Sequence, residues 1–247
     1  MAITNLSLVY RAHCLIGDHA AVTYTVVSED EKGFHMSISQ YCCRAIQVAF
    51  LGTLLTACAA APNLAPTAAP AGNYILDPAH TSVIWTVSHA GLSRYTARFD
   101  TVSGTLNFDP DAPESSHVHI RIDAASVSTG LPDFDDTIAM DAKYFDAGRY
   151  PDITFVTTHI SQTGETAGKI TGDLTFRGVT KPVILDAIFY GSGTSFGHPG
   201  KTLGFAATAT LQRREFGLTH LIAFGIGNEV EVRIETEFNE DAGKTSR

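Results

Sequence analysis

The chain has 247 residues, of which 44% are hydrophobic and 17% are charged, a composition typical of globular proteins rather than disordered ones. Its formal net charge is −9, and we expect no nucleic-acid partner because a phosphate backbone needs a clustered basic surface. The same acidic balance disfavours binding by charge to an anionic membrane surface, but it leaves a neutral lipid open as a ligand.

Residues 36–57 read MSISQYCCRAIQVAFLGTLLTA and have the layout of a bacterial signal peptide. Arg44 supplies the positive charge, and the uncharged stretch 45–57 that follows is too short to span a bilayer. The segment ends in Leu55-Thr56-Ala57-Cys58, which resembles a lipobox, the motif whose cysteine accepts a diacylglycerol group. A buried helix beside a chance cysteine is the alternative interpretation. We expect lipidation at Cys58, attachment to a membrane through this N-terminal lipid anchor, and a periplasmic location.

The segments on either side of this signal carry no core of their own. Residues 1–35 include an acidic run and lack the signal pattern, so we expect Met36 to be the true start and residues 1–35 to come from a misassigned start codon. Residues 58–72, CAAAPNLAPTAAPAG, are small, proline-rich and uncharged, which predicts a flexible linker. The four cysteines all lie at or before position 58, so the domain that follows has no disulfide and no thiol nucleophile.

From Tyr74 onward, apolar and polar residues alternate with a period of two, which predicts antiparallel strands with one apolar face and one wet face. Residues 228–238 show the pattern clearly, since valine, isoleucine and phenylalanine alternate with glutamate and arginine. A single region, 133–147, has the pattern of one or two short helices, and the tail 241–247 is expected to be disordered. The predicted strands are 82–89, 97–108, 117–123, 152–160, 168–176, 182–190, 202–212 and 228–238.

Eight amphipathic strands with one helical region predict an all-β domain, which can be either a sandwich or a closed barrel. A barrel of eight strands is wide enough to be filled by side chains or to hold one small ligand. Periodicity does not distinguish these two architectures, because the core of a sandwich is also apolar.

The stretch Gly193-Thr194-Ser195-Phe196-Gly197 matches the G-x-S-x-G motif of serine hydrolases, and Glu215 and His220 follow in the order of a triad. That motif needs a sharp turn from a strand into a helix, which helps to form the oxyanion hole. Here glycine and proline follow Ser195, which predicts a loop between two strands. A serine esterase at Ser195 is therefore disfavoured, and we expect no catalytic residues.

Histidines are the remaining candidates for chemistry. His117 and His119 could place two imidazoles on one strand face, but Val118 and Ile120 occupy the apolar face, so the two histidines are expected to face solvent without a metal. His89 shares the inward parity of Trp85 and could either reach a ligand or bond to a backbone carbonyl. The mixed-charge run 213–215 is interpreted as a solvated face, or as a contact for an anionic head group at a barrel mouth.

Several strings in the domain are distinctive, and together they resemble the YceI-like family of polyisoprenoid-binding proteins over about residues 73–239. The strings include MDAKYFD at 140–146, YPDITF at 150–155, GDLTFRGVTKPV at 172–183 and REFGL at 214–218. The resemblance implies an extended, eight-stranded, antiparallel, lipocalin-like barrel over residues 73–240, with one or two short helices. It also implies an internal tunnel that holds a prenyl quinone or a prenyl pyrophosphate.

The function expected from this resemblance is non-enzymatic binding, sequestration or transport of a polyisoprenoid lipid in the periplasm, without a cofactor. An envelope scaffold or stress protein with a filled barrel is the alternative, and a homodimer stays open. The family usually has glycine near position 98, where this chain has Arg98, so His89 and Arg98 are assigned as head-group contacts. With them, the residues expected to line the tunnel are Trp85, Val87, Phe99, Phe108, Ile120, Ile122, Phe155, Leu174, Phe176, Phe189 and Phe205.

Overall fold

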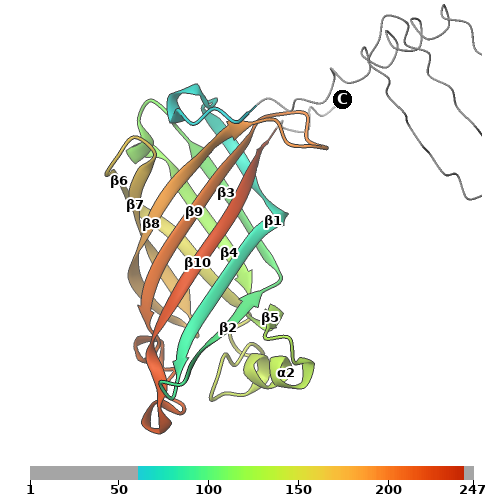
Figure 1. The fold of residues 1–247 in the computed structure, drawn as a ribbon, viewed down its shortest axis with the longest axis vertical. Coiled ribbons are helices and arrows are strands. Elements are labelled where there is room, and N and C mark those ends of the chain that lie inside the picture. Colours follow the sequence, from blue (N-terminus) through green and yellow to red (C-terminus); the bar gives the residue numbers. More distant parts are fainter. Residues whose placement is uncertain (1–60, 242–247) are drawn as a thin grey trace, which may run out of the picture. The chain divides into compact units, whose positions relative to one another are not determined.

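The computed structural model describes residues 61–241, which form one antiparallel sheet that closes on itself (Figure 1). The last strand, β10 (Ile226–Glu240), pairs with β9 (Thr202–Gln212) on one side and with β1 (Gly72–His89) on the other. Closure pairs each long strand of the wall with a neighbour on both sides. The remaining elements of the wall are β3 (Val102–Phe108), β4 (His117–Asp123), β6 (Asp152–Gln162), β7 (Ala167–Phe176) and β8 (Val179–Gly193).

Two short strands extend this wall at one end. Both β2 (Ser93–Phe99) and β3 pair with β1, and only Asp100 and Thr101 separate them along the chain. The strand β5 (Val127–Ser128) pairs with β2 and follows β4 after one 3₁₀ turn. When β2 is counted with β3, and β5 with β4, the wall has eight strands, and the prediction of an eight-stranded antiparallel barrel is confirmed.

The first strand begins ten residues before the predicted start at position 82. The sequence Asp77-Pro78-Ala79-His80 interrupts the alternation, and the pairing of β1 with β10 shifts register between Asp77 and Ser82. A strand can absorb such an interruption as a bulge, where a proline without an N–H is tolerated. The break therefore bends one long strand rather than separating a loop from a strand.

The helical region contributes a single α-helix in the part of the chain that the structure describes. The helix α2 (Pro132–Met140) starts with proline at its first turn, where the missing N–H costs nothing, and the chain then continues in turns. The residues predicted as the second half of this region bond back to the helix, for example through Phe145 N to Ile138 O at 3.0 Å. The segment covers one end of the barrel (Figure 1). Among the described residues, no helix has both the length and the apolarity needed to cross a bilayer.

Residues 61–71 are the described part of the predicted linker, and they lie at the end of the barrel opposite α2. Asn63 exchanges two backbone hydrogen bonds of 2.8 Å with Ser192, and Ala69 is buried, although most of the segment is exposed. The hydroxyl of Tyr74 donates to Pro70 O at 2.7 Å, and burial, followed by the nearby Glu240 carboxylate, raises the pKa of Tyr74 to about 12. The long strand β8 offers backbone partners that the composition of the segment could not reveal. The predicted leader, Cys58 and the tail 242–247 lie outside the described residues.

Candidate functional site

The interior of the barrel contains an apolar cavity of about 470 Å³. Every long strand of the wall contributes side chains to it, and most of these are aliphatic or aromatic. Its charged lining residues are Glu165, in the turn between β6 and β7, and Arg213, which follows β9, with His89 at the end of β1. The volume lies within the usual range for small-molecule sites of roughly 300–1,000 Å³. The described interior is therefore not completely filled by its own side chains.

Small residues keep part of this interior open. Ala187 on β8 and Ala207 on β9 lie directly opposite each other, and Ala209 follows on the same face of β9. Further along these two strands, Phe189 pairs with Phe205, and their ring centroids are 5.2 Å apart. Because side chains on alternate positions share a face, the alanines and the phenylalanines form one continuous inner surface.

All of the predicted lining residues except Arg98 border the cavity. They come from eight of the labelled strands, and the parity assigned to each strand places them on the inner face. His89 is exposed at the end of β1, where the cavity lining meets solvent. The residues are Trp85, Val87, His89, Phe99, Phe108, Ile120, Ile122, Phe155, Leu174, Phe176, Phe189 and Phe205.

The assignment of Arg98 as a head-group contact in the lining is wrong. Its side chain is 53% exposed, and its Nε lies 2.6 Å from Asp100 Oδ1 on the outer face. Phe99, the next residue, is buried and faces the cavity. Successive side chains of a strand point to opposite faces, so Arg98 and Phe99 cannot both face inward.

Some lining residues were missed because they lie in or beside the helical region. Phe134 and Ile138 are four positions apart on α2 and both border the cavity, as a pair on one helix face should. Tyr144 and Phe145 follow in the turns and also line it. Tyr95 on β2 was missed as well, although its alternation with Ala97 and Phe99 carried the signal.

Arg213 organises the chain at the end of the barrel that α2 covers. Its Nε donates to Gly227 O at 2.7 Å, and its two terminal nitrogens donate to Leu218 O and Ile226 O at 3.1 Å each. Burial lowers the pKa of the Arg213 guanidinium from its ordinary value. The solvated face that the sequence suggested for residues 213–215 is therefore wrong for Arg213, which bonds to the carbonyl of Leu218 and to the carbonyls of the first two residues of β10.

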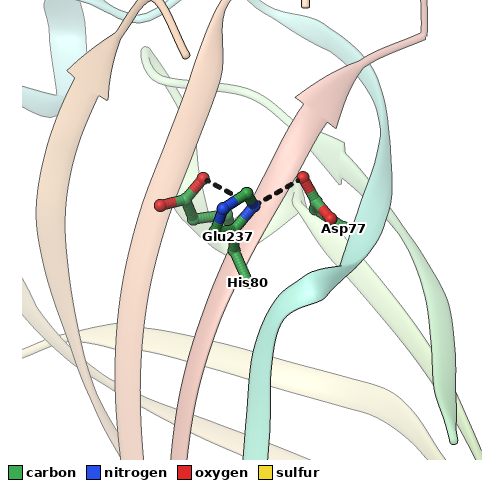
Figure 2. Close-up of side chains that lie close together, drawn as sticks. All are labelled: Asp77, His80 and Glu237. Atoms are coloured by element: carbon green, nitrogen blue, oxygen red, sulfur yellow. Dashed lines mark hydrogen bonds and ion pairs between the residues drawn. The ribbon is translucent and has the colours of Figure 1, made fainter. Parts of the chain in front are cut away.

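A second group of titratable side chains lies on the outside of the barrel. Figure 2 shows His80 between two carboxylates, with Nδ1 at 3.0 Å from Asp77 Oδ2 and 3.9 Å from Glu237 Oε2. The hydrogen bond that the His80 ring donates to the Asp77 carboxylate raises the pKa of His80 and lowers the pKa of Asp77. Asp77 also accepts from Ala79 N at 2.9 Å and from Asn239 Nδ2 at 3.1 Å. Since these bonds close the turn at the bulge of β1, we assign the group a structural role.

The serine motif does not form a triad in the described chain. Ser195 lies in an irregular loop before β9, and no helix follows it. Glu215 and His220 lie after β9, at the opposite end of that eleven-residue strand. At about 3.3 Å per residue, the strand separates them from Ser195 by more than roughly 30 Å.

Comparison with known proteins identifies the family. A sequence profile of the YceI-like domain matches residues 74–238, which is well over half of the chain and nearly all of the barrel. The chain belongs to the YceI-like family. This YceI-like chain is also 36% identical to a UPF0312 protein of Pseudomonas savastanoi pv. phaseolicola over 153 residues, 61% of this chain and 78% of the relative. It is 33% identical to a UPF0312 protein of Vibrio parahaemolyticus over 175 residues, 70% of this chain and 89% of the relative.

Solved structures share the YceI-like fold. The YceI protein of Campylobacter jejuni is 29% identical, with a TM-score of 0.54 over 60% of this chain and 86% of that one. A domain from Saccharophagus degradans, described as polyisoprenoid-binding, is similar in fold with a TM-score of 0.50 at 16% identity, over 69% of this chain and 99% of that one.

Proposed function

We propose that this protein binds a polyisoprenoid lipid, a prenyl quinone or a prenyl pyrophosphate, inside its barrel and sequesters or transports it without catalysing a reaction. The observation that carries this proposal is the apolar cavity, which is lined along the length of the wall by aliphatic and aromatic side chains. The polyisoprenoid-binding domain from Saccharophagus degradans, which has the same fold, supports the same class of ligand.

The chemistry of the lining suits an isoprenoid chain better than a small polar metabolite. A prenyl chain has no hydrogen-bonding groups. The inner faces of β7, β9 and β10 match it, because they consist mainly of leucine, isoleucine, valine, phenylalanine and alanine. Each buried five-carbon unit contributes roughly 3–4 kcal/mol at about 0.8 kcal/mol per carbon, before the cost of ordering the chain is subtracted. Binding therefore needs no covalent step and no cofactor.

Filling the cavity beside Ala187 tests the proposal. Ala207→Phe adds a ring beside Ala187 on the inner face, whereas Thr208→Phe adds the same ring one residue further on, at an exposed position. The purified proteins are incubated with a prenyl quinone, separated from free lipid and extracted for mass spectrometry. We expect the Ala207 variant to retain at least tenfold less lipid than the wild type, and the Thr208 variant to retain as much as the wild type.

Circular dichroism on both variants shows whether the barrel remains folded. If the wild type takes up no prenyl lipid, or if the folded Ala207 variant retains as much as the wild type, the proposal fails. A wild-type barrel that refuses prenyl quinones would support the scaffold function instead.

We also propose that the protein works in the periplasm, held at a membrane through a lipid on Cys58. The support is the order of features in the sequence, in which a positive residue, an uncharged stretch and small residues precede the cysteine. Cys58→Ser is expected to move the protein from the membrane fraction to the soluble fraction of cells. An unchanged distribution between the fractions would contradict the anchor.

A further inference from the structure

Two polar groups in the cavity wall have no partner. The indole Nε1 of Trp85 and the hydroxyl of Tyr95 are both inaccessible to solvent, and neither makes a hydrogen bond within the described chain. A buried donor without an acceptor loses its bond to water and gains nothing in return. A ligand that supplies the acceptor would explain both unpaired donors, because both residues border the cavity.

The two groups lie next to each other on the inner face of the barrel. Because Val87 on β1 pairs with Tyr95 on β2, Trp85 and Tyr95 are diagonal neighbours, and their ring centroids are 6.4 Å apart. Both border the cavity. One oxygen atom of a ligand in this part of the cavity can therefore accept from both groups, or two oxygens of a small head group can accept from one each.

Aromatic side chains surround this pair. Phe134 of α2 lies edge-on to Tyr95 at 6.2 Å, and Phe145 lies edge-on to Trp85 at 6.3 Å between centroids. Tyr144 lies edge-on to Phe134 at 6.4 Å, and all of these rings border the cavity. Aromatic walls with a few convergent polar groups are typical of sites that hold a flat, uncharged ligand group.

The charges of the lining do not suit an anionic head group here. Arg213 is the one arginine or lysine among the described residues that line the cavity, and each of its three nitrogens already donates to a backbone carbonyl. Glu165 lies in the β6–β7 turn, at the end of the barrel opposite α2 (Figure 1). A buried pyrophosphate would need paired cations, because removing its charge from water without them is strongly unfavourable.

We propose that Trp85 and Tyr95 donate hydrogen bonds to an oxygen of an uncharged head group, such as a ring carbonyl, at the end of the cavity that α2 covers. This inference rests on the proposed function and narrows its ligand class from prenyl lipids in general to those with a neutral, hydrogen-bond-accepting head. The prenyl chain then extends along the cavity away from α2. Trp85 and Tyr95 are specificity-determining residues in this arrangement.

Three probes with the same short prenyl chain separate the contribution of the head from that of the chain. One carries a 1,4-benzoquinone, one carries a phenyl ring of similar size without acceptors, and one carries a pyrophosphate. Trp85 is the sole tryptophan of the chain, so its fluorescence reports binding beside it directly. We expect the wild type to bind the quinone about tenfold more tightly than the phenyl probe, the effect of about one hydrogen bond, and to bind the pyrophosphate most weakly.

Conservative variants test the two donors. Tyr95→Phe removes the hydroxyl, keeps the ring and leaves the fluorescence of Trp85 as the readout; Trp85→Phe is measured by competition with a labelled probe. Each is expected to weaken quinone binding about tenfold and to leave binding of the phenyl probe unchanged. Tyr190→Phe, at a half-exposed outer position on β8, is the matched control and should bind all three probes as the wild type does.

The outcomes distinguish this inference from the proposed function. Equal affinity of the wild type for the quinone and phenyl probes, tighter binding of the pyrophosphate, or no effect of either variant would overturn the head-group assignment while the binding of a prenyl chain stands. If none of the three probes binds, the proposed function fails and the head-group assignment fails with it.

Discussion

The inner and outer faces of the barrel wall are built from alternate residues of the same strands, but they tolerate different chemistry. On β3, Leu106 is buried and borders the cavity, whereas its neighbour Thr105 is exposed on the outside. The ion pairs of the wall lie on the outer face, where water screens them, as between Arg121 and Asp152 at 2.6 Å. The inner face carries few polar groups, and Arg213 is satisfied there by three carbonyls.

The outer face tolerates apolar residues better than the inner face tolerates unpaired polar groups. Apolar side chains also occur on the outside, where Ile184, Ile188 and Tyr190 of β8 are about half exposed. An exposed apolar residue costs little, but an unpaired polar group inside costs its lost hydration. The fold therefore restricts the residue types on the inner face more strongly than those on the outer face.

Adding a charge to each face should give the largest difference. Leu106→Asp places a carboxylate between the buried Tyr74 and the partly buried Val118, and we expect it to destabilise the protein by roughly 3–5 kcal/mol, as an uncompensated buried charge does. Thr105→Asp makes the same change one residue earlier and should cost less than about 0.5 kcal/mol. Urea denaturation followed by circular dichroism measures both. Similar losses from the two variants would show that the faces do not differ in this way.

Removing an arginine from each face should give a smaller difference. Arg213→Met removes the donor from three backbone carbonyls. We expect a loss of roughly 2–4 kcal/mol, because a bond from a charged donor contributes about 1.5–3 kcal/mol and the three bonds come from one side chain, so their contributions are not independent. Arg94→Met removes an exposed ion pair with Glu231, and its midpoint of denaturation should stay within error of the wild type. A loss from the Arg94 variant as large as that from the Arg213 variant would contradict this assignment.

The sequence predicts the division into two faces well, because the period of a strand is a local property. On β10, Val232 faces the cavity and Glu231 faces solvent, as their alternation predicts. The boundaries of the strands follow from turn residues. They differ from the prediction most where Asp77 and Pro78 interrupt β1, and where Asp100 and Thr101 divide the predicted strand 97–108 into β2 and β3. Periodicity alone does not distinguish a barrel from a sandwich, because closure depends on the pairing of β1 with β10, which are far apart in the chain.

The finer features of the site depend on distances that the pattern does not contain. Ala187 and Ala207 leave space only because they face each other across two strands. The missing partners of Trp85 and Tyr95 become visible only when every nearby acceptor is placed. Arg98 was assigned from its position in the family pattern against its own strand parity, and the parity was the better guide.

The smallest expected effect comes from the titratable group on the outer face (Figure 2). The pKa of His80 is raised in the folded protein, so its contribution to stability is complete below its ordinary value of 6.5 and is lost as the pH rises through the higher folded value. The pKa of Asp77 is lowered, so its contribution is complete above 3.8 and is lost as the pH falls through the lower folded value. The pair therefore stabilises the protein most between about pH 4 and pH 6.5.

His80→Asn should lower the midpoint of thermal unfolding within this window and have less effect above and below it. The effect should be small, because the His80 ring is 56% exposed. His119→Asn, which replaces another exposed histidine on the outer face, is the matched control and should show no such window. If the loss from the His80 variant grew steadily from pH 6.5 to pH 9, the neutral ring would be the stabilising form. His80 would then hold the bulge of β1 through a hydrogen bond that needs no charge.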